Sequence, residues 1–174
     1  MTSSDPACAT AHGELPPDHG PRTLVAIFES PVADHLLRFA ADLGFRAVLV
    51  EPNPQLLAGT PRPHGDQTVS SVDAAGLTAQ TDVVVTDHDR PELGTVLRDV
   101  LKAKTRWVGV MGSPRHAPQH VPALQALGVD DGEIARVHRP IGLNIGSKTP
   151  AEIALSTLAG LIADRNARPG GFTF

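Results

Sequence analysis

Residues 24–50 read LVAIFESPVADHLLRFAADLGFRAVLV, and this stretch decides the fold of the chain. It opens on a short apolar run, 24–28, which fits a β-strand buried on both faces. Ser30 is placed as the N-cap of a following helix and Pro31 as its first residue, where a missing N–H costs nothing. A second apolar run, 47–50, predicts another buried strand. The stretch therefore predicts a strand, a helix and a strand in succession.

The rest of the chain continues this alternation of apolar strands and helices. In chain order, we expect a weak strand at 67–70, a poorly marked helix after it, a strand at 82–86, a helix opening near 91, a strand at 107–111, a helix at 119–127, a short turn or helix at 130–137 and a long helix opening at 149–152. Nearly all-apolar strands that alternate with helices indicate a parallel sheet covered on both faces. Right-handed crossovers then predict an α/β fold: a doubly wound, mostly parallel Rossmann-like sheet with helices on both faces.

The composition is that of a single globular domain. The 174 residues are 41% hydrophobic and 20% charged, with a formal net charge of −4. This acidic balance argues against nucleic acid or an anionic membrane as a partner, because both attract basic surfaces. No apolar run approaches the roughly 18 residues that a bilayer-spanning helix needs.

Three segments are expected along the chain. Residues 1–21 are rich in Pro, Gly, Ser and His without periodicity, and we interpret them as a disordered leader. Residues 22–167 are expected to form one Rossmann-like domain, followed by a flexible tail at 168–174. The start lacks the basic and apolar regions of a secretory signal, and Cys8 is the single cysteine. We therefore expect a cytoplasmic protein.

The turn after the first strand lacks the glycines of a dinucleotide-binding site. Such sites use G-x-G-x-x-G/A so that the backbone can turn tightly and approach the pyrophosphate. Residues 28–34 read FESPVAD instead, which argues against the usual NAD(P) site. Glu51, at the end of the second strand, matches the acidic residue that would bind a ribose hydroxyl. Its simpler interpretation is a solvated carboxylate in a turn.

The segment 109–116 is a better candidate for contact with a polar ligand. Gly112 lets a backbone approach closely, Ser113 carries a hydroxyl, and Arg115 supplies a cationic fork suited to phosphate or carboxylate. The alternative is an ordinary strand-to-helix turn with an exposed arginine. The segment lacks G-x-S-x-G, which argues against a serine hydrolase.

A second candidate segment, 138–149, reads HRPIGLNIGSKT and is only superficially similar to a phosphate-binding P-loop. Its glycines are spaced differently, and no strand leads straight into it. The candidate anion-binding residues there are Gly142, Asn144, Gly146, Lys148 and Thr149. Positive φ at the first three would form a concave turn of amides, and the lysine and the following helix N-terminus favour an anion. Alternatively, the glycines only shape a loop packed under the sheet.

Histidines are weighed as metal ligands or as ligand contacts. His116 and His120 are four residues apart, as two zinc ligands on a helix can be, but Pro118 lies between them and no third ligand is spaced convincingly. We therefore expect no metal site. His88, just after the strand at 82–86, is a candidate acid/base group or ligand contact, or simply a loop histidine.

Three ordered motifs carry a resemblance to a known family. WVGVMGSPR at 107–115, PIGLNIG at 140–146 and TPAEIALS at 149–156 resemble the C-terminal Rossmann domain of the XdhC family. DVVVTDHD at 82–89 is similar to the family's strand that ends in a Thr-His-Asp-type turn, with one extra residue here. Gly160 stands where the family's final helix usually carries Glu.

The resemblance implies an accessory role for a molybdenum hydroxylase of the xanthine dehydrogenase or carbon monoxide dehydrogenase type. Members bind molybdenum cofactor, protect it during sulfuration and help insert it into the partner enzyme, commonly as dimers, and are assembly factors more than enzymes. Carried across, the contacts to a phosphate-bearing pterin become Gly112, Ser113, Arg115, Gly142, Asn144 and Gly146, with Lys148, Thr149 and His88 beside them. Two alternatives stay open: an NAD(P)-binding oxidoreductase, and a degenerate Rossmann domain that binds only protein.

Overall fold

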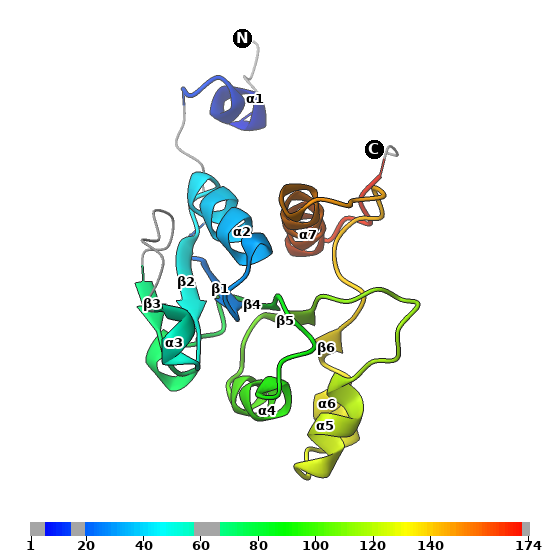
Figure 1. Ribbon diagram of the computed structural model, residues 1–174. Helices are drawn as coiled ribbons and strands as arrows, with labels where there is room; N and C mark the ends of the chain where they lie inside the picture. The colour runs from blue at the N-terminus through cyan, green and yellow to red at the C-terminus, as the bar shows by residue number, and fades with distance from the viewer. Residues whose placement is uncertain (1–5, 15–19, 58–66, 172–174) are drawn as a thin grey trace.

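The computed structural model describes residues 6–14, 20–57 and 67–171. The strands are β1 (Thr23–Ile27), β2 (Arg46–Val50), β3 (Gln67–Val69), β4 (Thr81–Val85), β5 (Trp107–Val110) and β6 (Val137–His138). They form one parallel sheet in the order β3-β2-β1-β4-β5-β6 (Figure 1). The order runs outward on both sides of β1, as in a doubly wound sheet. The predicted fold class is thus confirmed.

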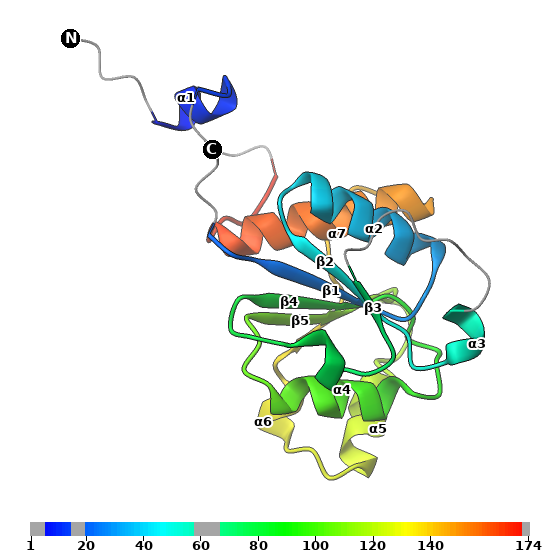
Figure 2. The ribbon, with the colours of Figure 1, turned by 90° about the vertical axis from the view of Figure 1, so that its left-hand side faces the viewer.

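Helices cover both faces of the sheet. The helices of the described residues are α1 (Pro6–Ala11), α2 (Pro31–Asp42), α3 (Pro54–Leu57), α4 (Leu93–Lys102), α5 (His120–Ala126), α6 (Asp131–Ile134) and α7 (Pro150–Arg165), with a 3₁₀ turn, η1, at Asp73–Ala75. α2 and α7 pack side by side on one face, and α4, α5 and α6 lie on the other (Figure 2). Among the described residues, no helix combines the length and the apolar character that a bilayer requires.

Each face of the sheet buries its own apolar layer. Leu24 of β1 packs with Leu36 of α2 and Leu158 of α7, whereas Val25 faces the opposite layer, which includes Leu97 of α4. Neighbouring residues of a strand point to opposite faces, so a strand buried on both sides must be apolar throughout. This requirement explains why the apolar run at 24–28 predicted a strand buried on both faces.

The two long helices on one face begin as their sequences predict. Ser30 caps α2, its hydroxyl accepting the amide of Ala33 at 3.1 Å, and Pro31 follows at the first helical position. Thr149 caps α7 and forms a reciprocal capping box with Glu152. These caps fix where the chain leaves the sheet and enters each helix.

Some elements differ from the sequence prediction. The poorly marked helix after β3 is only the 3₁₀ turn η1, and the sixth strand was not predicted because two residues cannot show an apolar run. In the segment expected to be a disordered leader, α1 forms a short helix in the alanine-rich stretch PACATA. The domain boundaries at 22 and 167 stay predictions.

A contact between two glycines holds the chain after β6 against α7. Gly142 has φ +87°, and a Cβ on Gly160 would lie 2.9 Å from its α-carbon. The Leu143 amide donates to the carbonyl of Ser156 at 3.0 Å, and the Ser156 hydroxyl donates to the carbonyl of Leu143 at 2.6 Å. Gly160 therefore lets the loop approach the helix backbone.

Replacing Gly160 by Ala tests this packing. Helix propensity favours Ala by about 1 kcal/mol, but the new methyl meets backbone atoms, and overpacking of this kind costs about 1–3 kcal/mol. We expect Gly160→Ala to lower the free energy of unfolding, measured by urea denaturation. Gly132→Ala is the matched control, because Gly132 is also helical and has open space around it; it should be neutral or stabilising. Equal stabilisation by both substitutions would contradict the proposed packing.

Candidate functional site

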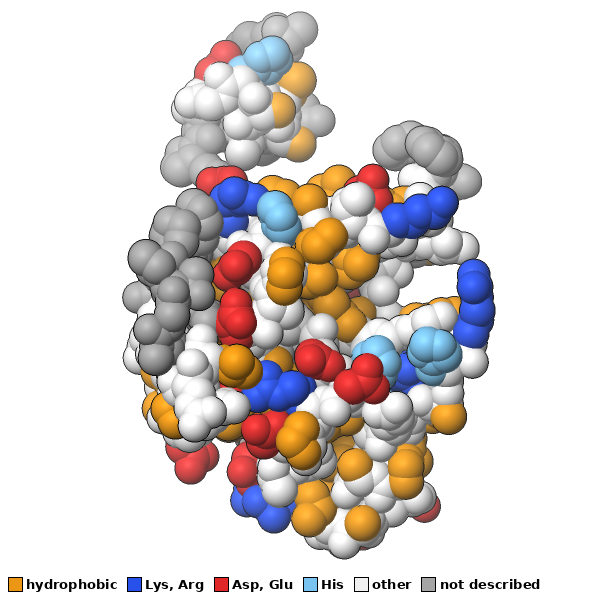
Figure 3. Space-filling view, in the orientation of Figure 1, with side chains coloured by type: hydrophobic (Ala, Val, Ile, Leu, Met, Phe, Trp, Pro, Cys, Tyr) orange, Lys and Arg blue, Asp and Glu red, His pale blue; other side chains and the backbone are white. Residues whose placement is uncertain are grey.

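Loops from neighbouring strands meet at the carboxyl ends of β1, β2, β4 and β5. In doubly wound sheets this edge, where the strand order reverses, is where ligands bind. In Figure 3 acidic, basic and histidine side chains gather in the middle of the visible face, between α2 and α7 above and α4 and α5 below. The loops 28–34, 51–54, 86–91 and 109–116 lie together at this edge, as hydrogen bonds and a pair of neighbouring histidine rings show.

A buried ion pair spans this edge. Glu51, after β2, is fully buried, and both of its carboxylate oxygens accept from Arg90, after β4, at 2.9 and 3.2 Å. The amides of Glu29 and Asn53 each donate to the same carboxylate at 2.8 Å. Interpreting Glu51 as a solvated turn carboxylate was wrong: its side chain is shielded from solvent, and both of its oxygens already accept hydrogen bonds from the protein.

The carboxyl group of Glu51 is held in its charged form. Burial alone would raise its pKa, but the hydrogen bonds from Arg90 and from the amides of Glu29 and Asn53 outweigh that effect and lower the pKa below the ordinary glutamate value. The hydrogen bond to Glu51 first, and then that to Glu92, raise the pKa of Arg90. The pair is therefore ionised on both sides at neutral pH.

Phe28 lies beneath the arginine of this pair. Its φ is +73°, a conformation that costs a bulky residue energy and that dinucleotide-binding proteins assign to glycine. The ring is buried, and the guanidinium carbon of Arg90 lies 4.7 Å from its centroid. The Thr86 hydroxyl lies 2.7 Å from the carbonyl of Phe28. The turn after β1 therefore carries a phenylalanine with positive φ, whose buried ring lies beside the Glu51–Arg90 pair.

Sequence reasoning missed Arg90. Nothing adjacent to it marks it as special, since it stands in an ordinary polar run, DHDR, after a strand. Its role depends on β2 and β4 flanking β1, which brings Arg90 across Phe28 to Glu51. A pairing between loops 39 residues apart becomes visible only once the strand order is known.

The loop between β5 and α5 carries the first predicted ligand segment. The Ser113 hydroxyl accepts the amide of Arg115 at 3.2 Å, so the turn is closed by its own side chain. Arg139, just after β6, donates to the carbonyls of Ser113 and His116 at 3.4 and 3.3 Å. Arg115 is exposed. Within the described residues, neither arginine pairs with a carboxylate, so this loop carries uncompensated positive charge.

His88 lies at the rim of the same loop. Its ring centroid is 6.5 Å from that of His116, and its Nε2 is 3.7 Å from a carboxylate oxygen of Asp89. His120, in contrast, is buried, with 4% of its surface exposed. In the described ranges, no group of three or more His, Cys, Asp or Glu residues could hold a metal ion.

Comparison with known proteins fits this geometry. Residues 24–161 match the XdhC Rossmann domain. The chain belongs to this family. It is 31% identical to uncharacterized protein YqeB of Escherichia coli (strain K12) over 160 residues, which are 88% of this chain and 29% of the relative. It is 24% identical to a probable xanthine dehydrogenase subunit of Bacillus subtilis (strain 168) over 144 residues, 75% of this chain and 39% of the relative.

A solved structure agrees on the fold. The crystal structure of a xanthine dehydrogenase from Bacillus halodurans matches with a TM-score of 0.68 at 23% identity, over 88% of this chain and 45% of that one. The XdhC domain described here spans 29–39% of the length of the two curated relatives. The resemblance of three sequence motifs to the XdhC family is thus confirmed.

The second predicted ligand segment of this XdhC domain, residues 138–149, packs against α7. Gly142 and Gly146 have the positive φ that was predicted, at +87° and +70°, whereas Asn144 does not. A Cβ on Gly142 would lie 2.6 Å from the Ser156 hydroxyl, which supports the alternative of a loop packed against its neighbour. Asn144 and Gly146 are exposed.

The N-terminus of α7 already holds a carboxylate. Glu152 accepts the amides of Lys148 and Thr149 at 2.8 and 3.0 Å. These bonds, from Lys148 first, lower the pKa of Glu152 and keep it charged. The anion expected at this helix end is therefore the protein's own, and an external phosphate would have to displace it.

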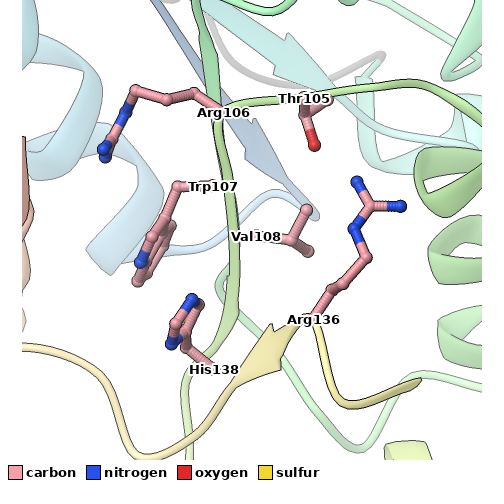
Figure 4. A pocket seen from close by; sticks show the side chains of 6 residues that line it. All are labelled: Thr105, Arg106, Trp107, Val108, Arg136 and His138. Carbon is pink, nitrogen blue, oxygen red and sulfur yellow. The ribbon is translucent and has the colours of Figure 1, made fainter. Parts of the chain in front are cut away.

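A cavity of about 150 Å³ lies apart from this edge, at the amino end of β5. Figure 4 shows Trp107 and His138 lying together on one side of it, and their stacked rings are 5.2 Å apart. Its two arginines are already paired: Arg106 with Asp82 and Asp164, and Arg136 with Glu133. Because this cationic lining is neutralised by the protein, the carboxyl edge of the sheet remains the stronger candidate site.

Replacing Glu51 by Gln tests the ion pair across the candidate site. The substitution breaks a pair whose carboxylate is fully buried and leaves the half-buried Arg90 guanidinium with Glu92, at 3.3 Å, as its other carboxylate partner. Breaking a buried ion pair costs about 3–5 kcal/mol, and the remaining contact places the expected loss at the lower end. We expect Glu51→Gln to lower the free energy of unfolding by about 3 kcal/mol in chemical denaturation. Glu133→Gln removes the exposed pair with Arg136 and should cost at most about 1 kcal/mol. If both variants lost the same free energy of unfolding, the Glu51–Arg90 pair would not act as a buried ion pair.

The lowered pKa of Glu51 also predicts a pH dependence. A carboxyl with a lower pKa in the folded state stabilises the protein above its unfolded pKa, and this stability is lost as pH falls through the folded pKa. We expect the wild type to lose stability below about pH 4.5 more steeply than Glu51→Gln, in thermal unfolding at matched ionic strength. Parallel pH profiles would contradict this, because the other acidic groups are common to both proteins.

Proposed function

We propose that the chain is an accessory or maturation factor for a molybdenum hydroxylase of the xanthine dehydrogenase or carbon monoxide dehydrogenase type. In this role it binds molybdenum cofactor, or helps insert it, as a homodimer in the cytoplasm. Membership of the XdhC family supports the proposal. So do a relative named as a probable xanthine dehydrogenase subunit and a fold neighbour named xanthine dehydrogenase.

One observation carries the choice of ligand. The turn after β1 lacks glycine and holds Phe28 beside the Glu51–Arg90 pair, while the neighbouring loop at 112–116 carries Arg115 and accepts from Arg139, and neither arginine has an acidic partner among the described residues. A pterin with a terminal phosphate dianion suits such a loop, because guanidinium groups bind phosphate strongly and with defined geometry. In this proposal Arg115 and Ser113 contact the phosphate end, and His88 lies at the rim.

The chain's own residues then act as a carrier. A cationic loop at the sheet edge holds an anionic cargo without a covalent bond, so the cargo can pass on to a partner with higher affinity. We propose that the chain assists the assembly of the hydroxylase and does not itself catalyse a reaction. The partner is the molybdenum hydroxylase subunit that receives the cofactor.

The NAD(P)-dependent oxidoreductase is the weaker alternative. It would require Arg90 to leave Glu51 and the chain around Phe28 to move, at the cost of a buried ion pair. A degenerate domain that binds only protein is the other alternative. It predicts a complex with the molybdoenzyme that is indifferent to loss of Arg115.

Parallel anaerobic titrations separate these possibilities. We expect the purified protein to bind molybdenum cofactor saturably and to show no thermal shift with millimolar NADH or NADPH. Arg115→Gln should weaken cofactor binding about tenfold, as loss of a charge-assisted hydrogen bond predicts. Arg98→Gln is the matched control, because it removes an arginine that already pairs with Asp99; it should leave affinity unchanged.

Binding of NADH with no binding of cofactor would overturn the proposal in favour of the oxidoreductase. Binding of neither, together with a stable complex with the hydroxylase, would favour the protein-only domain. In the cell, deletion of the gene should lower the amount of active, cofactor-loaded hydroxylase, and unchanged loading would also contradict the proposal.

A further inference from the structure

The solvent side of α7 is apolar along most of its length. Leu155 is 56% exposed, more than any other large apolar side chain among the described residues. Ala151, Ala159 and Ile162 are partly exposed, and at about 100° per residue they lie on the same side of the helix as Leu155. We call residues 151, 155, 159 and 162 the outer stripe. A helix at the surface of a globular protein normally carries polar residues on this side, so an apolar outer stripe indicates a partner that covers it.

The other sides of α7 are already covered. Its inward residues pack in the apolar layer shared with the sheet and α2: Ala154, Leu158 and Leu161. On the flank beyond the outer stripe, Ser156 and Gly160 hold the loop at 142–143. That loop continues to Ile145, which is 54% exposed. Figures 1 and 2 show α2 along one side of α7, whereas no described helix covers its outer side.

The order of side-chain sizes along the outer stripe matches its own reverse. From the N-terminus it is small, large, small, large: Ala151, Leu155, Ala159, Ile162. When two α7 helices lie antiparallel about a two-fold axis, Leu155 comes opposite the partner's Ala159. In the same register Ala151 comes opposite the partner's Ile162. Each large side chain then packs beside a small one, and because a two-fold interface presents the same patch twice, one stripe supplies both halves.

Charges at the ends of the outer stripe suit the same antiparallel pair. Lys148 is exposed just before α7, and in this register it lies at the C-terminal end of the partner's helix, whose partial negative charge attracts a cation. Arg165 at that end is turned to the buried Asp82, with its Nε 2.7 Å from the carboxylate. The Glu152 carboxylate is held by the amides of Lys148 and Thr149. The stripe between these ends is therefore free of charge, and its ends are complementary.

We propose that two copies of this chain associate through the outer stripe of α7, antiparallel about a two-fold axis, with Ile145 beside the contact. This inference rests on the homodimer of the proposed function and deepens it, since it assigns the interface and its register. It also explains why the solvent side of α7 lacks the polar residues that an isolated domain would carry there.

Sedimentation velocity of the full chain tests this surface. We expect the wild type to be a dimer and Leu155→Glu to raise the dimer dissociation constant at least about a hundredfold, because each copy buries one added charge and each charge costs tenfold or more. The circular dichroism of the variant should match the wild type, since Leu155 is more than half exposed in the single chain. Leu56→Glu is the matched control, because Leu56 of α3 is also an exposed leucine, at 40%; it should leave the dissociation constant unchanged.

A mixture of two variants tests the antiparallel register. Ala159→Lys alone should also give monomers, because a long charged side chain replaces the small residue opposite the partner's Leu155. Leu155→Glu and Ala159→Lys mixed in equal amounts should form a heterodimer. In it the introduced glutamate meets the introduced lysine on one side of the axis, and Leu155 meets Ala159 on the other.

Three results would overturn the assignment. The first is a wild-type chain that stays monomeric throughout the concentration series. The second is a folded Leu155→Glu protein with the wild-type dissociation constant, which would place the dimer contact elsewhere. The third is a mixture of the two variants that remains monomeric, which would refute the register.

The experiment contains no molybdenum cofactor, so this assignment and the carrier role can fail separately. A monomeric wild type that binds the cofactor would refute the dimer surface and leave the carrier role intact. A dimer that dissociates on Leu155→Glu, in a protein that binds no cofactor, would support the surface and refute the carrier role.

Discussion

The ion pair between Glu51 and Arg90 is the interaction on which the carboxyl edge of this sheet depends. It connects the ends of β2 and β4 across β1, and the arginine also covers Phe28, whose positive φ is strained. Strain of this kind persists only where the surroundings over-determine it. The pair therefore connects the loops after β2 and β4 and packs over the unusual turn after β1.

The opposite end of the sheet is fixed by a separate network. Asp82, fully buried at the start of β4, contacts Arg106 and accepts from Arg165 of α7 at 2.7 Å. Buried charges thus tie both ends of the central strands, whereas Arg115 and Arg139 beside the loop after β5 have no acidic partner among the described residues. This distribution supports the proposed carrier role, because unpaired guanidinium groups suit an anionic ligand.

The sequence predicted the architecture well and the site only in part. Apolar strands, the Ser30 cap and the Thr149 capping box are local signals, so the strand–helix alternation could be recognised directly. The burial of Glu51 was not predicted because its partner, Arg90, is 39 residues away along the chain. Gly142 was a candidate anion-binding residue yet packs against α7. Contacts between residues far apart in the sequence are properties of the folded chain, and they leave no periodic signal in the sequence.

The most direct test of the account is a crystal structure of the protein grown anaerobically with molybdenum cofactor and NADH both present. We expect pterin phosphate beside Ser113 and Arg115 in the loop at 112–116, with the Glu51–Arg90 pair unbroken. A dinucleotide whose pyrophosphate lies over Ser30, with Arg90 turned away from Glu51, would contradict it.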